Sequence, residues 1–259
     1  MASNPAAKSP ASASKPAHGP EYWVRAREPL ACLIFLAPLL VVYEVGILMF
    51  GGPDAGGIRN GADYWMREWL MQFGFEDMWL LPGLVVGILL IWHVAGKYSW
   101  RVSADTLVGM FAESLLFAFL LVVVGQFQGL AFERLGAGVP LSTGLRALTA
   151  PVITYTGAGL YEEVLFRLCL LPVCYLILRT ARVSPRTSAV VAILATSLLF
   201  SAAHYVGNEA YEFTLFSFTF RALAGLFFAV LFVVRGFGIT VGCHAAYDVL
   251  VGVLLTTSG

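Results

Sequence analysis

Long apolar blocks alternate with short polar stretches along this chain. Seven blocks can be delimited, at residues 30–50, 78–96, 106–131, 150–178, 188–206, 213–234 and 238–256. Each is close to the length of about 20 residues that a helix needs to cross the hydrocarbon core of a bilayer. Backbone groups in lipid must be hydrogen-bonded internally, and no block shows the alternation of a barrel strand. The pattern predicts an all-α, polytopic transmembrane bundle of about seven spans.

The polar stretch between the first two blocks has a pattern of its own. Residues 51–77 open with Gly-Gly-Pro and continue into a segment where Trp65, Trp69 and Phe73 recur at helical spacing. Indole rings favour the headgroup region, where an apolar body meets water. We therefore expect a short interfacial helix between the first two spans, with its indoles at headgroup depth.

The remaining chain divides by composition. Residues 1–25 are rich in Ala, Ser, Pro and Lys, and such a segment buries too little apolar surface to offset the entropy of ordering. We expect a disordered cytosolic tail there. Residues 26–149 are interpreted as N-terminal transmembrane helices, and residues 150–259 as a transmembrane core that carries the chemistry.

Composition supports lipid as the solvent. Hydrophobic residues make up 59% of the chain, charged residues make up 12%, and the mean hydropathy is +0.80. A soluble domain has about 25% charged residues. The net charge is zero, so no overall field favours nucleic acid as a partner. We expect membrane lipid and a membrane-bound or lipidated protein substrate as partners, and no nucleic acid.

Basic residues in the short loops predict the orientation. With the N-terminus inside, ten of them fall on the inner side and four on the outer side, and the positive-inside rule favours this arrangement. The inner group is Lys8, Lys15, Arg25, Arg27, Lys97, Arg101, Arg179, Arg182, Arg186 and Arg235; the outer group is Arg59, Arg67, Arg134 and Arg146. We expect a multi-pass integral protein of the plasma (inner) membrane with a cytoplasmic N-terminus.

Ionisable residues at membrane depth are costly, so each one is a functional hypothesis. The fourth block contains Glu162-Glu163-Val-Leu-Phe-Arg167. On a helix Glu163 and Arg167 share a face and can pair, whereas Glu162 points about 100° away. A carboxylate in a low-dielectric cavity suits a general base that takes a proton from water. The alternative is an ion pair that only joins helices.

Two further polar pairs lie in later blocks. Phe200 and His204 share a helical face in the fifth, and His244 and Asp248 do so in the seventh. His204 could act on the same water as Glu162 or bind a metal, and Asp248 could orient His244 or contact a developing oxyanion. Taken singly, each pair is also typical of a structural histidine. The three clusters together indicate chemistry on water.

The ordered motifs EExxxR, FxxxH and HxxxD resemble those of the CAAX prenyl protease and bacteriocin-processing (CPBP) family, also known as abortive-infection-type membrane proteins. The resemblance covers about residues 150–250, the last four spans. It implies an intramembrane endopeptidase that hydrolyses a peptide bond in a membrane-bound or lipidated, CAAX-like substrate through a water molecule activated by a glutamate.

The resemblance also implies roles for individual residues. Glu162 would activate the water together with His204. His244 and Asp248 would stabilise the oxyanion or position the substrate. The supporting pair would be Glu163 and Arg167. The prenyl-protease branch usually has Asn in place of Asp248, and an ionised Asp is a poor donor to an oxyanion, so Asp248 would stay protonated, orient His244 or bind a metal.

The motifs do not decide whether the protein uses a metal ion. The family name often includes "metalloprotease", whereas the resemblance to its prenyl-protease members implies glutamate peptidases with no required metal. We favour no cofactor and no metal. Zinc is the alternative, because imidazole and carboxylate suit this ion. Its ligands would be Glu162, His204, His244 and Asp248.

Straight spans would hold the three clusters at depths that differ by about 10 Å, at about 1.5 Å rise per residue. Either the block boundaries are wrong by one or two turns, or Gly207, Gly236, Gly238 and Gly242 mark broken helices and re-entry around a hydrated cavity. We predict the second. Two rival functions stay open. One is a catalytically silent membrane scaffold, and the other is a proton-coupled carrier whose buried Glu and His relay protons.

Overall fold

The computed structural model describes residues 22–51, 59–136, 149–207 and 212–255, and within these ranges every regular element is helical. The α-helices are α1 (Tyr22–Arg25), α2 (Pro29–Phe50), α3 (Gly61–Gln72), α4 (Leu80–Ala95), α5 (Ala104–Arg134), α6 (Thr149–Gly157), α7 (Leu171–Thr180), α8 (Pro185–Ala203), α9 (Leu215–Arg235) and α10 (Phe237–Val249). The π-helical segments are η2 (Ala158–Glu162), η3 (Val164–Leu170) and η4 (Leu250–Leu255). The predicted all-α class is confirmed.

The apolar blocks coincide with these helices. Within the described residues, α2, α5, α8 and α9 are long and apolar enough to cross a membrane, and α4 and α10 are apolar but shorter. The fourth block is a consecutive run of α6, η2, η3 and α7. The chain is thus a polytopic helical membrane protein. Of the expected tail, residues 22–25 form α1 and residues 1–21 lie outside the described ranges.

Side chains at the helix starts explain the element bounds. Ser103, Ser184 and Thr214 precede α5, α8 and α9, and each side chain accepts a hydrogen bond from a backbone N–H in the first turn. These caps satisfy donors that would otherwise be unpaired. Gly236 ends α9 with a φ of +90°, a conformation that glycine adopts without strain, and α10 starts directly after it.

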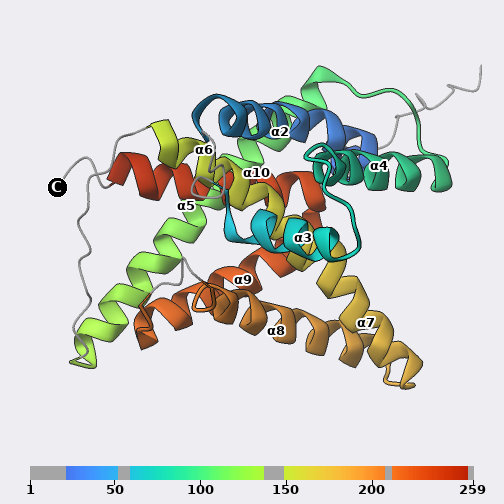
Figure 1. Ribbon diagram of the computed structural model, residues 1–259. Helices are drawn as coiled ribbons and strands as arrows, with labels where there is room; N and C mark the ends of the chain where they lie inside the picture. Colours follow the sequence, from blue (N-terminus) through green and yellow to red (C-terminus); the bar gives the residue numbers. More distant parts are fainter. Residues whose placement is uncertain (1–21, 52–58, 137–148, 208–211, 256–259) are drawn as a thin grey trace, which may run out of the picture.

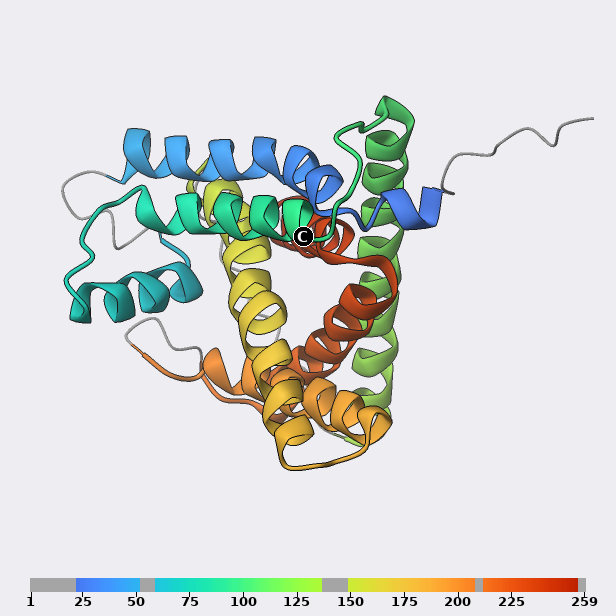
Figure 2. The same cartoon turned by 90° about the vertical axis from the view of Figure 1, so that its right-hand side faces the viewer.

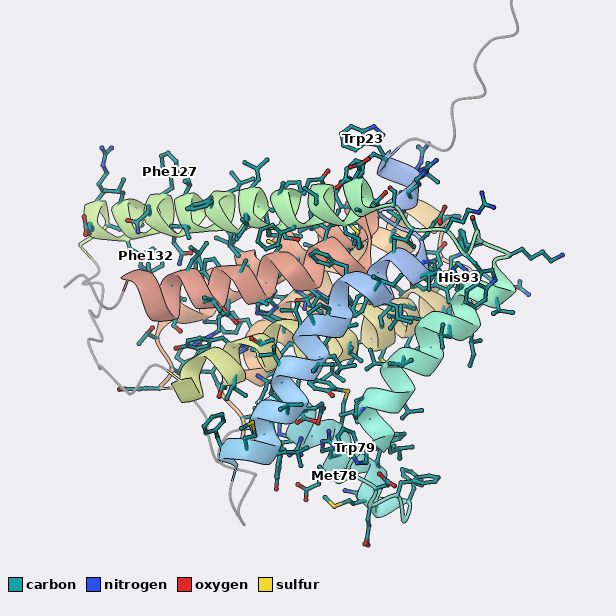
Figure 3. The ribbon with its side chains drawn as sticks, turned by 90° about the horizontal axis from the view of Figure 1, so that it is seen from above. Trp23, Met78, Trp79, His93, Phe127 and Phe132 are labelled. Atoms are coloured by element: carbon teal, nitrogen blue, oxygen red, sulfur yellow. The ribbon has the colours of Figure 1, made fainter. Side chains whose placement is uncertain are left out.

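The helices cross one another rather than running parallel. Figure 1 shows α5 running from the top of the molecule to the lower left and α7 running to the lower right, with α8 and α9 packed together in the lower part and α2 and α4 packed together in the upper part. In Figure 2, α2 and α4 run across the direction of α5 and α7. Helix α10 packs against α5, α2 and η2, so it lies in the centre. Seen from above, α5 extends from near Trp23 to Phe127 and Phe132 (Figure 3).

The glycines of α10 have a different role from the one predicted. Gly238 and Gly242 lie inside the unbroken helix α10, so the expected breaks at these two positions are wrong. A Cβ on Gly238 would lie 2.6 Å from Met110 Cε, and one on Gly242 would lie 2.5 Å from Ser114 Oγ. Both glycines therefore allow α5 to approach α10 closely. Gly207 and Gly236 do follow helix ends, at φ of +101° and +90°.

Candidate active site

The two adjacent glutamates lie where the fourth block departs from α-helical geometry. Glu162 ends η2, Glu163 stands between the two π-helical segments, and Arg167 lies in η3. A π-helical turn is wider than an α-helical one and is often found at functional sites. Both carboxylates are buried, and both face polar groups from other elements. The π-helical run thus directs two neighbouring carboxylates into the bundle.

Glu163 is the centre of a buried ionic cluster. Its Oε2 lies 3.0 Å from Arg167 Nε, and its Oε1 lies 2.7 Å from His244 Nδ1. Arg167 also donates from Nη2 to the Gly225 carbonyl at 3.0 Å, and its guanidinium lies 4.7 Å from the centre of the Phe200 ring. The i, i+4 pair expected from the sequence is therefore present. It ties η3 to α9 and, through His244, to α10.

His244 is held on three sides. Glu163 occupies its Nδ1, while its Nε2 lies 3.4 Å from Asp248 Oδ2 and 3.8 Å from Glu162 Oε2. The Phe228 ring of α9 stacks on the imidazole, with 4.3 Å between centroids and 17° between planes. With carboxylates near both ring nitrogens, His244 can donate hydrogen bonds from both. The ring therefore presents Nε2 toward Glu162 in a fixed orientation.

His204 follows directly after α8, as its C-cap residue. Its Nδ1 lies 2.8 Å from the Phe200 carbonyl oxygen. Because a carbonyl can only accept, Nδ1 carries the proton, and Nε2 is an acceptor in the neutral ring. That Nε2 lies 3.8 Å from Glu162 Oε2. His204 therefore offers a basic nitrogen on the side of Glu162.

Polar side chains from several elements surround Glu162. Its Oε1 accepts a hydrogen bond from Asn60 Nδ2 at 2.9 Å. Its buried Oε2 has no hydrogen-bond partner among the described residues and lies 3.8 Å from the Nε2 atoms of both His204 and His244. These separations exceed a direct hydrogen bond. One carboxylate oxygen is thus fixed, and the other faces two imidazoles across a short gap.

Exposure separates these side chains into two groups. Glu163 and Arg167 side chains are 0% and 2% exposed, whereas those of Glu162, His204 and Asp248 are 11%, 19% and 22% exposed. A side chain that acts on a substrate must be open to that substrate, whereas a side chain that only positions another residue can be fully enclosed. The two adjacent glutamates therefore have different surroundings: the Glu163 side chain is completely enclosed, whereas the buried Glu162 side chain is partly exposed although its Oε2 is itself enclosed.

Within the described part of the chain, no group of three His, Cys, Asp or Glu is arranged to hold a metal ion. His244 already engages Glu163 with one nitrogen, which leaves Nε2 as its only ring atom toward the gap. Asp248 Oδ2 lies 3.4 Å from this Nε2. The zinc alternative, with Glu162, His204, His244 and Asp248 as ligands, stays a prediction.

Two residues near this site were missed by the sequence reasoning. Phe228 stacks on His244, and Asn60 bonds Glu162 across 102 positions of the chain. The only local signal at Asn60 is its place as a helix cap, ahead of Gly61, which predicts the start of α3 but no contact with the fourth block. Phe228 belongs to an apolar run in which no aromatic residue stands out.

Gly159 decides how closely α10 approaches η2. A Cβ there would lie 2.5 Å from the backbone nitrogen of Ala245, the neighbour of His244. Backbone cannot yield as a side-chain tip can, so Gly159→Ala should push α10 away and lower stability by about 1–3 kcal/mol. Unfolding temperature in detergent measures this, and a fall of several degrees is expected. Gly87→Ala in α4, with open space around it, is the matched control. Equal temperatures in the two variants would contradict the close contact.

Comparison with known proteins supports the resemblance given by the motifs. Residues 144–250 match the family model described as "Rce1-like: Type II CAAX prenyl endopeptidase Rce1-like". No curated protein and no solved structure matches the chain. The matched stretch contains Glu162, His204, His244 and Asp248, and it ends before the last residues of η4. Over these residues the match supports the resemblance to the CPBP family that the motifs indicate.

Proposed function

We propose that the chain is an intramembrane endopeptidase that hydrolyses a peptide bond in a membrane-bound, lipidated protein of the CAAX type. One observation carries the proposal: a buried carboxylate oxygen of Glu162, with no hydrogen-bond partner among the described residues, faces the Nε2 atoms of His204 and His244. The match to a prenyl endopeptidase family over the same residues supports the substrate class.

The proposed reaction begins with water bound between Glu162 Oε2 and His204 Nε2. Both atoms accept hydrogen bonds, and a water oxygen at about 2.8 Å from each fits the 3.8 Å that separates them. Glu162 takes one proton while the water oxygen bonds to the scissile carbonyl carbon. The carbon–nitrogen bond then breaks, and the proton passes from Glu162 to the leaving amine. Water is consumed: one of its protons ends on the leaving amine, and the other stays on the new carboxyl group until that group ionises and releases it to solvent. Two peptides result, one with a new carboxylate and one with a new amine.

His244 is suited to the negative charge that develops on the carbonyl oxygen. Its Nε2 faces the same gap, and Glu163 fixes the opposite nitrogen. A donor held in place before the reaction stabilises an oxyanion more than one that must reorient. We propose that Asp248, 3.4 Å from this Nε2, orients His244 and favours its donor form, which is one of the three roles that the sequence leaves open.

A direct assay tests the function. The protein is purified in detergent and given a fluorogenic farnesylated CAAX peptide, with the same peptide lacking the prenyl group as a control. The wild type should cut the prenylated peptide, and His204→Ala should lower kcat by about 10²-fold or more, because the acceptor for water is lost. An excess of chelator should leave the rate unchanged. Chelator inhibition that zinc reverses would support the zinc alternative instead.

The same preparation separates the rival functions. Absence of cleavage together with a proton flux that depends on Glu162 would favour the carrier. Absence of both would favour the silent scaffold. Cleavage at the wild-type rate in His204→Ala would show that this imidazole has no part in the reaction, provided that the variant unfolds at the same temperature as the wild type.

A further inference from the structure

The N-terminal half of the chain contributes one side chain to the candidate site. Asn60 precedes α3, outside the stretch 144–250 that matches the family model. It is 9% exposed, and its Nδ2 donates to Glu162 Oε1 at 2.9 Å. Every other polar side chain that we place around Glu162 comes from residues 162–248. Asn60 is therefore an addition to the motif-bearing helices.

The orientation of the Asn60 amide follows from its second contact. Its Oδ1 accepts a hydrogen bond from the backbone N–H of Ala62 at 2.8 Å. An N–H group needs an acceptor, and the amide has only one oxygen, so the NH₂ end has to face Glu162. The oxygen of the Asn60 amide thus caps α3, and the nitrogen of the same amide donates to Glu162. The amide can hold a carboxylate, which only accepts.

The backbone around Asn60 is itself anchored. Its N–H donates to the Tyr43 hydroxyl at 3.1 Å, and that hydroxyl donates to Asp63 Oδ2 at 2.8 Å. Asp63 is completely buried and also receives Arg59 Nη1 at 2.7 Å and Arg67 Nε at 2.6 Å. Buried charges are stable only when they are paired in this way. The start of α3 is therefore fixed against α2 by a closed polar cluster.

The same cluster reaches the fourth block at the residue before Glu162. Arg67 Nη2 lies 3.3 Å from Glu44 Oε1, and Glu44 accepts a hydrogen bond from the Tyr161 hydroxyl. The cluster therefore fixes Asn60 and the backbone of η2 relative to each other. A hydrogen bond between two such fixed points restricts the rotamer of Glu162 more than a contact from a loose loop would.

We propose that Asn60 is a positioning residue for the proposed peptidase reaction. By holding Oε1, its amide directs Oε2 of Glu162 toward His204 and His244 and leaves that oxygen available for water. The inference rests on the proposed function and extends it to the N-terminal helices. It also means that α3, which contains the exposed Trp69, is connected to Glu162 by the hydrogen bond from its N-cap residue, Asn60.

Two variants separate positioning from helix capping. Asn60→Ser keeps a good cap for α3 but is too short to donate to Glu162, and Asn60→Ala loses both contacts. If Asn60 positions the base, both variants should lower kcat for the farnesylated peptide by about 10²-fold, as a misplacement of about 1 Å can do, with KM unchanged. Only Asn60→Ala should unfold at a clearly lower temperature.

The outcomes are distinguishable from those for the function itself. Cleavage by the wild type that is lost in Glu162→Gln supports the peptidase, whatever the Asn60 variants do. With that established, a wild-type kcat in Asn60→Ser overturns the positioning role and leaves only a cap. A rise in KM with kcat unchanged would also overturn it, because it would place Asn60 in substrate binding. Equal losses of kcat in both variants support the proposal.

Discussion

Replacing Glu162 by glutamine is expected to lower the rate of peptide hydrolysis by about 10²–10⁴-fold, the usual contribution of a general base. Glutamine has nearly the same shape, and its amide oxygen can still accept from Asn60. Its NH₂ group then faces His204 and His244, where a proton acceptor is needed. The measurement is kcat for the farnesylated peptide in detergent.

Stability should change little in this variant. Glu162 has no ion pair closer than 3.8 Å, whereas its neighbour Glu163 has two close cationic or imidazole partners. Glu68→Gln, the same chemical change at an exposed position of α3, is the matched control and should keep full activity. Wild-type turnover in Glu162→Gln would place the general base elsewhere and reject the mechanism.

Local spacing made much of this site predictable. The pair Glu163 and Arg167 depends on two positions four residues apart, and the structure shows them 3.0 Å apart. His244 and Asp248 have the same spacing and also lie close together. Apolar block lengths predicted the spans, because helix length and bilayer thickness are related by a fixed rise per residue. Such inferences need no knowledge of how the helices cross.

Contacts between distant segments were not predictable in this way. The expected breaks at Gly238 and Gly242 came from an argument about depth that assumed straight, parallel α-helices. The structure instead has π-helical turns around Glu163 and helices that cross steeply, as α2 and α5 do in Figure 2. Neither feature has a local signal in the sequence. The bond from Asn60 to Glu162 is of the same kind, since it depends on how α3 folds back.

Arg167→Leu is expected to lower the free energy of unfolding by about 3–5 kcal/mol, the usual cost of removing one partner from a buried ion pair. Arg167 is 1% exposed, so water cannot replace it beside Glu163. The variant also loses the bond to the Gly225 carbonyl and the contact with the Phe200 ring. Thermal unfolding in detergent measures the change, at about 2–4 °C per kcal/mol.

Two further variants identify the cause of this loss. Arg167→Lys keeps a cation beside Glu163 but lacks the planar guanidinium that reaches Gly225 while lying against Phe200, so its loss should be intermediate. Arg186→Leu removes an arginine from the exposed start of α8 and should cost little. If Arg167→Leu were as stable as the wild type, Glu163 would not need its cation, and His244 alone would hold it. The two adjacent glutamates would then differ less than their surroundings indicate, and the proposed division between an enclosed supporting residue, Glu163, and a general base, Glu162, would fail.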